Sequence, residues 1–222
     1  MSIREIEERL SSARDRLQQA AKALAPRHKG GEWEEYWAAH EAVLRLERAL
    51  AAAKGEEHAV PLDFPVKWDV GAPLPHLLRN DYRCFLTFYV REHDPAWDGT
   101  YVRVKDPGSG VAESVALVEF AGCVSAKLGS PNDEVFEGHP LSGKGLDGYT
   151  AQEVLNSRWL AELEAINSVH RCYDPDRWRR LHHYVLWFHD TTFECVAESF
   201  TVELYRESTA ELLGRVCMRL LS

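Results

Sequence analysis

The stretch HHYVLWFHDTTFECVAE, residues 182–198, decides the fold that we predict for this chain. Asp190 and Thr191 stand between two runs rich in aromatic and β-branched residues, which is typical of a β-hairpin with a two-residue turn. Side chains in each run alternate between the two faces of a sheet. One face is apolar throughout, whereas the other gathers histidines and carboxylates, which are costly inside a strand unless they are paired or used.

The predicted register brings these ionisable groups together. With a two-residue turn, His183 lies opposite Glu198, Trp187 lies opposite Glu194, and His189 stands beside the turn. A histidine and a carboxylate that face each other shift each other's pKa and can serve as base and acid. The same face turns apolar beyond residue 198, which favours a sheet curved around a pocket, with Glu194, Glu198, His183 and His189 as catalytic candidates and Trp187 as an aromatic wall.

A long loop over residues 129–149 adds further candidates. Loops of this length without regular structure are uncommon in compact domains and are often functional. Asp133, Glu134 and His139 are placed to close over the hairpin face and to contact a substrate. Turn formation and solubility explain the same residues more simply, so both interpretations stay open.

The rest of the chain predicts an α+β fold of three parts. Residues 1–55 carry apolar side chains at alternating steps of three and four, which predicts an antiparallel helical hairpin. Residues 56–80 form a proline-rich connector, and residues 81–222 form an α+β sheet domain. We expect the hairpin to pack on a curved, mostly antiparallel β-sheet flanked by two helices.

Local patterns place the elements of the sheet domain. Before the hairpin of residues 182–198, aromatic and β-branched runs predict strands at 84–91, 100–105, 115–120 and 124–128. Thr150 and Glu153 form a capping box, so we expect the first flanking helix to begin there. Another capping box, at Ser208 and Glu211, predicts the start of the last helix.

Composition narrows the classes of function. The 222 residues carry 26 Lys and Arg against 35 Asp and Glu, and the formal net charge of -9 opposes broad contact with nucleic acid or anionic lipid. The five cysteines include no C-x-x-C spacing, and no histidine spacing is typical of a metal site, so we predict no metal ligands and the cofactor stays unknown. With no signal peptide and no apolar run of about 20 residues, we expect a cytoplasmic protein without a membrane span.

Three strings, GSPNDE at 129–134, GHPL at 138–141 and FHDTTFECVA at 188–197, resemble a set of uncharacterised bacterial proteins. The resemblance covers roughly residues 60–221. Because that set has no established activity, the resemblance implies a stand-alone bacterial cytosolic protein and gives no residue a role.

Two functions of different classes follow from these patterns. The first is a protein with a pocket for a small-molecule ligand, and the residues leave open whether it is an enzyme that uses carboxylate and histidine acid–base chemistry. The second is a non-catalytic protein-interaction module, a partner-binding or inhibitor protein with an acidic working surface. In that case the hairpin of residues 183–198 shows an exposed outer face with ordinary cross-strand pairs. The wide apolar face of the second helix predicts contact with the main domain or with a second copy in a homodimer.

Overall fold

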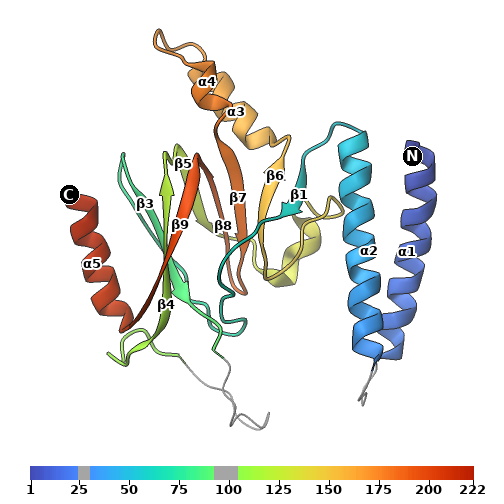
Figure 1. Ribbon diagram of the computed structural model, residues 1–222, viewed down its shortest axis with the longest axis horizontal. Coiled ribbons are helices and arrows are strands. Elements are labelled where there is room, and N and C mark those ends of the chain that lie inside the picture. The colour runs from blue at the N-terminus through green and yellow to red at the C-terminus, as the bar shows by residue number, and fades with distance from the viewer. Residues whose placement is uncertain (25–30, 93–104) are drawn as a thin grey trace.

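The computed structural model describes residues 1–24, 31–92 and 105–222, and its fold is α+β, as the sequence predicts (Figure 1). Two long helices open the chain, α1 (Ile3–Ala23) and α2 (Glu32–Ala53). The predicted strand at 100–105 lies outside the described residues except for Lys105, which is not in a strand. No helix in the described part of the chain is long and apolar enough to cross a membrane.

The described strands form two antiparallel sheets rather than one curved sheet. The first sheet has the order β1 (His58–Pro61), β6 (Ala151–Leu155), β7 (His182–Trp187), β8 (Thr192–Ala197) and β5 (Ser125–Gly129). The second sheet has the order β2 (His76–Arg79), β3 (Cys84–Tyr89), β4 (Glu113–Ala121) and β9 (Ser199–Glu207). The chain passes from the first sheet to the second at Glu198, which lies between β8 and β9.

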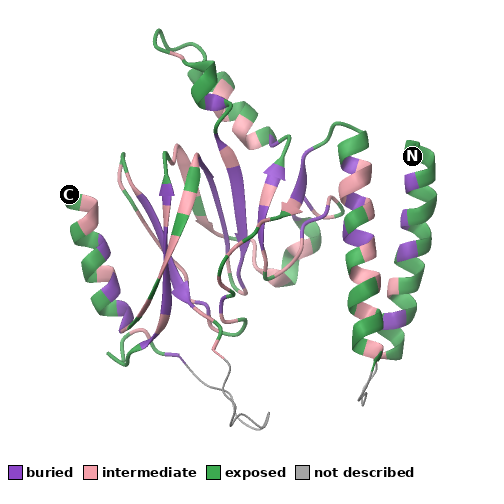
Figure 2. Ribbon diagram, in the orientation of Figure 1, coloured by how far each residue is buried: buried purple, intermediate pink, exposed green. Residues whose placement is uncertain are grey.

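The main hydrophobic core lies between the two sheets. The face of the hairpin that the sequence predicts to be apolar supplies Tyr184, Leu186, Phe188, Phe193, Cys195 and Ala197. These side chains pack with Leu86 and Phe88 of β3 and with Val118 and Phe120 of β4. Burial follows the same pattern along the ribbon, where the central strands of both sheets are mostly buried (Figure 2). Alternation along each strand therefore predicts this face correctly.

The predicted register of the hairpin is wrong by two residues. His183 pairs with Val196 rather than Glu198, and Trp187 pairs with Thr192 rather than Glu194. The cause is the position of the turn. The Phe188 N–H donates to the Thr191 carbonyl at 3.0 Å, so His189 and Asp190 lie at the turn, one residue earlier than predicted. A shift of two keeps every side chain on its predicted face but changes its cross-strand partner.

The helix predicted to begin at Thr150 is also misplaced. Residues 151–155 form β6, which pairs with β1 and β7. The helix begins later, as α3 (Arg158–Asn167) with Ser157 at its N-cap, and a short helix α4 (Pro175–Trp178) follows. Backbone pairing on both edges of β6 outweighs the local capping signal, since propensity is readily overridden by tertiary context.

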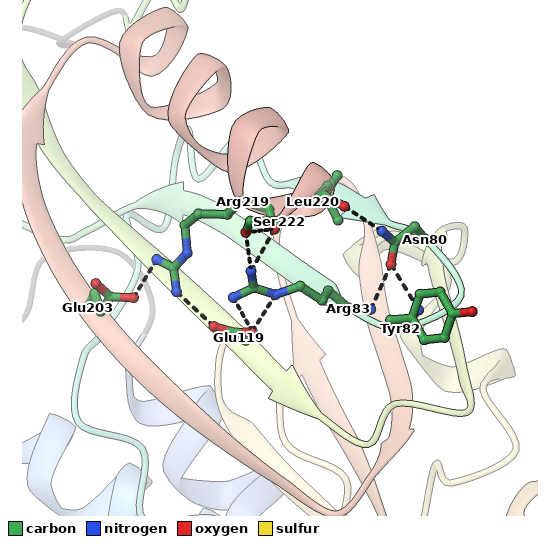
Figure 3. A network of polar contacts seen from close by, with 8 residues as sticks. All are labelled: Asn80, Tyr82, Arg83, Glu119, Glu203, Arg219, Leu220 and Ser222. Atoms are coloured by element: carbon green, nitrogen blue, oxygen red, sulfur yellow. Dashed lines mark hydrogen bonds and ion pairs between the residues drawn. The ribbon is translucent and has the colours of Figure 1, made fainter.

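The last helix, α5 (Thr209–Leu221), covers the outer face of the second sheet. Its capping box at Ser208 and Glu211 is present as predicted. Leu212 and Val216 pack on Phe85 and Leu117. Polar contacts fix its C-terminal end, because Arg219 of the helix and Arg83 beside β3 both bind Glu119 at 2.7 Å (Figure 3).

The helical hairpin of α1 and α2 docks on the edge of the first sheet beside β1, at the opposite end of the molecule from α5 (Figure 1). Arg48 of α2 donates to the carbonyls of Ala59 and Gly145, each at 3.1 Å. Contact of α2 with the main domain is therefore confirmed. Trp33 and Trp37 stay 50% and 56% exposed, and the predicted contact with a second copy stays a prediction.

Candidate functional site

The outer face of β7 and β8 is buried, and it carries a cluster of ionisable side chains. The loop before β6 covers Trp187, and the apolar face of α3 packs over Val196. Between them lie His183 and Glu194, which are only 4% and 7% exposed. The two groups interact in a low-dielectric environment, where a charge–charge contact is stronger than in water.

Glu194 is held by three cationic or donor groups. Its Oε2 lies 2.9 Å from His183 Nε2, and its Oε1 lies 2.8 Å from Lys127 Nζ and 3.9 Å from His139 Nε2. Burial acts to raise the pKa of the Glu194 carboxyl, but the contacts with His139, His183 and Lys127 outweigh it and hold the pKa well below its usual range. Glu194 is therefore an ionised carboxylate at neutral pH.

Ser157 completes a chain of hydrogen bonds through the imidazole. Its Oγ lies 2.8 Å from His183 Nδ1 and accepts the Leu160 N–H at 3.1 Å as the N-cap of α3. Asn156, with φ of 52°, turns the backbone between the end of β6 and the start of α3. A sharp strand-to-helix turn thus places a serine hydroxyl against the histidine.

The partners of the imidazole define where its proton lies. An ionised carboxylate only accepts hydrogen bonds, so His183 Nε2 carries a proton and donates to Glu194. When Nδ1 carries no proton, it accepts the hydrogen bond of the Ser157 hydroxyl. This order of hydroxyl, imidazole and carboxylate is the one by which a serine becomes a nucleophile, with the two ring nitrogens in exchanged positions relative to the serine proteases.

The Ser157–His183 pair borders an open cleft of about 310 Å³. Apolar walls come from Leu160, Trp178 and Leu181. At the rim, His182 Nδ1 lies 2.7 Å from Glu153 Oε1. A cleft of this size suits a small substrate group, since pockets for small molecules measure roughly 300–1,000 Å³.

No protein-family model, curated protein or solved structure matches this chain. The resemblance to a set of bacterial proteins therefore stays a prediction. The geometry of the site is the basis for assigning a function.

The structure brings together some of the residues predicted from the sequence. His183, Glu194 and His139 meet on the buried face, and Trp187 packs edge-on against His139 with ring centroids 5.4 Å apart. Trp187 is fully buried, so it supports the site from behind and does not line the cleft. Of the loop residues predicted to lie over the hairpin, His139 is the one that reaches Glu194.

Glu198 is separated from this cluster. Its carboxylate lies 3.7 Å from the Arg180 guanidinium, and its side chain packs against Gly122. The register error explains the difference, because the turn one residue earlier moves Glu194 next to His183 and leaves Glu198 where the chain leaves the sheet. The predicted pairing of His183 with Glu198 is therefore wrong.

His189 and the acidic loop residues form a second group, at the turn end of the hairpin. His189 contacts Asp190 at 2.9 Å and Asp133 at 3.8 Å, while Glu134 is exposed in the 3-10 turn η1 (Asp133–Gly138). The hydrogen bond with Asp190 raises the pKa of His189, and Asp133 acts in the same direction. Among the described residues, no group of three or more His, Cys, Asp or Glu side chains could hold a metal ion.

Sequence reasoning missed Ser157 and Lys127. Lys127 lies directly opposite Glu194 in the pairing of β5 with β8, so the predicted strand at 124–128 contained it but its pairing with the hairpin was not predicted. Ser157 is a typical N-cap residue in front of the apolar residues of α3, which is a weak signal for a helix start. The sequence pattern of a capping box at Thr150 and Glu153 led instead to a predicted helix start seven residues too early. Contact of Ser157 with His183 depends on how α3 packs on the sheet.

Proposed function

We propose that this protein is a hydrolase in which Ser157 is the nucleophile, His183 the general base and Glu194 the carboxylate that orients the imidazole. The observation that carries the proposal is the continuous path from Ser157 Oγ to His183 Nδ1 (2.8 Å) and from His183 Nε2 to Glu194 (2.9 Å), beside an open cleft. This sharpens the sequence-based hypothesis of a pocket with carboxylate and histidine acid–base chemistry.

The proposed reaction is an acyl transfer in two steps. Ser157 Oγ attacks the carbonyl carbon of an ester or amide while its proton passes to His183 Nδ1, and the leaving group then departs with that proton. Water adds to the acyl-serine in the second step, giving its proton to His183, and Ser157 is regenerated as the acid leaves. Glu194 stays ionised throughout and stabilises the imidazolium that forms in each step.

The first turn of α3 supports the developing negative charge. Ser157 is the N-cap of a ten-residue helix, so the positive end of the helix macrodipole lies at the reacting oxygen. The Leu160 N–H that bonds Ser157 Oγ favours its alkoxide form for the same reason.

The cleft favours a small acyl group of apolar character. Leu160, Trp178 and Leu181 offer apolar surface next to Ser157, and the paired Glu153 and His182 give the rim a polar edge. We therefore expect short-chain esters to be the most reactive simple substrates.

The test is covalent labelling with a fluorophosphonate probe, which reacts with activated serines. We expect one label on the full chain, placed at Ser157 by peptide mass spectrometry, and loss of the label in Ser157→Ala. Ser168→Ala is the matched control, because Ser168 is an exposed serine at the other end of α3. Hydrolysis of p-nitrophenyl acetate should follow the labelling, and Glu194→Gln should reduce its rate roughly 10³-fold.

Two outcomes decide against the proposal. Labelling of Ser157→Ala equal to that of the parent, or failure of the folded parent to react with the probe, leaves the Ser157–His183–Glu194 path as a structural link between α3 and β7. The alternative, a partner-binding or inhibitor module with an acidic surface, would then be the better hypothesis.

A further inference from the structure

Three of the five cysteines meet where the chain passes from the second sheet to the first. Cys123 lies in the short connection between β4 and β5, which belong to different sheets. Cys84 is the first residue of β3, and Cys195 lies within β8. Both of these side chains belong to the core between the sheets, and Cys123 is partly buried against that core. The fold therefore gathers three thiols from segments that are far apart in the sequence.

The Cys123 sulfur is the centre of this cluster. It makes side-chain hydrogen bonds with the thiols of both Cys84 and Cys195, and all three cysteines are free. The Cys123 thiol also lies 3.4 Å from the Ser125 carbonyl, to which it donates while it carries its proton. A disulfide forms between sulfurs that can approach each other closely, so Cys123 has two candidate partners.

Cys123 differs from its two neighbours in access to solvent and in charge. Cys84 and Cys195 are fully buried, whereas Cys123 is half-buried and follows two exposed residues. The hydrogen bonds from Cys195 and Cys84 hold the pKa of Cys123 well below its ordinary value. The Arg79 guanidinium acts in the same direction, and Arg79 is the cross-strand partner of Cys84. Reactive cysteines are partly exposed thiolates beside a cation, and Cys123 has these properties.

The two buried cysteines stay protonated. The hydrogen bond with Cys123, together with burial, raises the pKa of the Cys84 thiol. Burial raises the pKa of the Cys195 thiol well above its ordinary value, and the hydrogen bond with Cys123 adds to the effect. The cluster thus pairs one accessible thiolate with two shielded thiols, which is the arrangement of a cysteine that is oxidised first and of cysteines that react with it afterwards.

We propose that Cys123 is a site of oxidation by hydroperoxides and that it then forms a disulfide with Cys84 or Cys195. In the first step the Cys123 thiolate attacks one oxygen of the hydroperoxide and the O–O bond breaks. The other oxygen leaves as water or an alcohol after it takes up a proton, and Cys123 becomes a sulfenic acid. In the second step a buried thiol gives up its proton, and its sulfur attacks the Cys123 sulfur while the hydroxyl group leaves as water. Two thiols lose two electrons in total, and the hydroperoxide gains them.

Either disulfide would tie the connection between β4 and β5 to a strand of the core. A bond to Cys84 joins it to β3 of the second sheet, and a bond to Cys195 joins it to β8 of the first sheet. Because both thiols contact the same sulfur, the loss of one leaves the other in place.

The test is treatment of the full chain with hydrogen peroxide, followed by alkylation and peptide mass spectrometry without reduction. We expect a chain that is lighter by two hydrogen atoms, with a link from Cys123 to Cys84 or Cys195 that dithiothreitol reverses. In the same molecule, Cys123 should react with peroxide roughly tenfold faster than the exposed Cys172. Cys217→Ser is the matched control, because Cys217 is exposed and outside the cluster, and it should oxidise as the parent does.

Variants of the cluster separate the two steps. Cys123→Ser should form no disulfide, whereas Cys84→Ala and Cys195→Ala should each form one with the remaining partner. The double variant of Cys84→Ala and Cys195→Ala should stop at the sulfenic acid, which dimedone labels at Cys123. Thermal unfolding checks that each variant is folded, and mapping of the link in the parent decides the question even if a core variant is not.

Three results would overturn the proposal. The first is a parent in which Cys84 and Cys195 both remain free thiols after peroxide treatment. The second is a link in the parent that leaves out Cys123, and the third is a disulfide that still forms at the same rate in Cys123→Ser.

Discussion

At the scale of single residues, the charge of Glu194 controls the site. A buried carboxylate with contacts to His183, Lys127 and His139 is more acidic in the folded chain than in the unfolded chain, where its pKa is about 4.3. The unfolded state therefore binds more protons than the folded state as the pH falls. Stability from Glu194 is fully present above the unfolded pKa and is lost as the pH falls through the lower folded pKa.

The lowered pKa of Glu194 in the folded state gives a prediction for acid denaturation. The free energy of unfolding of the parent should fall steeply below pH about 4, and Glu194→Gln should flatten that dependence because it removes the titrating group. Urea denaturation at several pH values between 3 and 7 measures the effect. A slope unchanged in Glu194→Gln would show that other carboxylates govern acid unfolding. Glu198→Gln serves as the control, since Glu198 is half-buried beside Arg180 and outside the buried cluster.

His189 is predicted to be dispensable for the reaction that we propose at Ser157. It lies at the turn end of the hairpin, is 42% exposed at its side chain, and contacts Asp190 and Asp133 instead of His183. His189→Ala should therefore label with the fluorophosphonate probe as the parent does, whereas His183→Ala should lose more than about 99% of the labelling rate. A comparable loss in both variants would mean that His189 takes part in the chemistry.

For single residues, the sequence predicted correctly the features that depend only on the alternation of side chains along a strand. The positions of His183 and Glu194 on one face follow from a period of two along each strand, whatever the register. Their contact with Ser157 and Lys127 does not follow, because it depends on the packing of α3 and on the pairing of β5 with β8. No local pattern around Ser157 distinguishes a nucleophile from an ordinary N-cap residue.

At the scale of the elements, the position of the turn is what the sequence failed to specify. Asp190 and Thr191 suit a tight turn, but the turn lies one residue earlier, at His189 and Asp190, and the Phe188 side chain before it is fully buried in the core between the sheets. Burial of that ring helps to fix the turn, and the hairpin register follows from the position of the turn. The strand β6 was missed for a similar reason, since its pairing with β1 involves residues nearly 100 positions apart.

The docking of α5 offers a prediction at this scale. Glu119 of β4 accepts hydrogen bonds from Arg83 and Arg219, and the three side chains are about one-quarter exposed (Figure 3). Glu119→Ala should lower the free energy of unfolding by about 1.5–3 kcal/mol, because it removes charge-assisted bonds that hold the helix end. Chemical denaturation measures the loss. Glu8→Ala is the control, since its ion pair with Arg4 is highly exposed and should contribute under about 0.5 kcal/mol; equal losses would contradict the assignment.

At the scale of the whole molecule, the strands form two packed sheets. The sequence predicted one curved sheet, because alternation continues from Glu194 through Phe200 and Val202. In the structure those two residues pack in the core between the sheets, after the chain has crossed over at Glu198. A period of two cannot reveal such a crossing, because alternation continues unbroken while the strand changes its sheet.

The helical hairpin stabilises the first sheet from its edge, and Arg48 is the main polar link. Its guanidinium, with the side chain 13% exposed, donates to carbonyls of β1 and of the loop at Gly145, while Glu47 accepts the Gly145 N–H at 3.4 Å. Arg48→Met keeps much of the apolar stem but removes the Arg48 bond to the Ala59 carbonyl, while the Gly145 carbonyl keeps its bond from Gln152 Nε2 at 3.0 Å, and the loss should cost about 1–3 kcal/mol. Amide hydrogen exchange should quicken in β1 and at residues 144–147 more than in β3 and β4.

Arg45→Met is the matched control for this prediction, because Arg45 lies three residues earlier on the exposed face of the same helix. Its exchange pattern should be that of the parent. If Arg48→Met left β1 as protected as the parent, apolar packing alone would hold the hairpin on the sheet. If exchange rose uniformly through both sheets, the hairpin and the sheets would unfold as one cooperative unit. Faster exchange confined to the docked edge means that the hairpin opens as a separate unit while the hydrogen bonds of Ser157 and His183 stay intact.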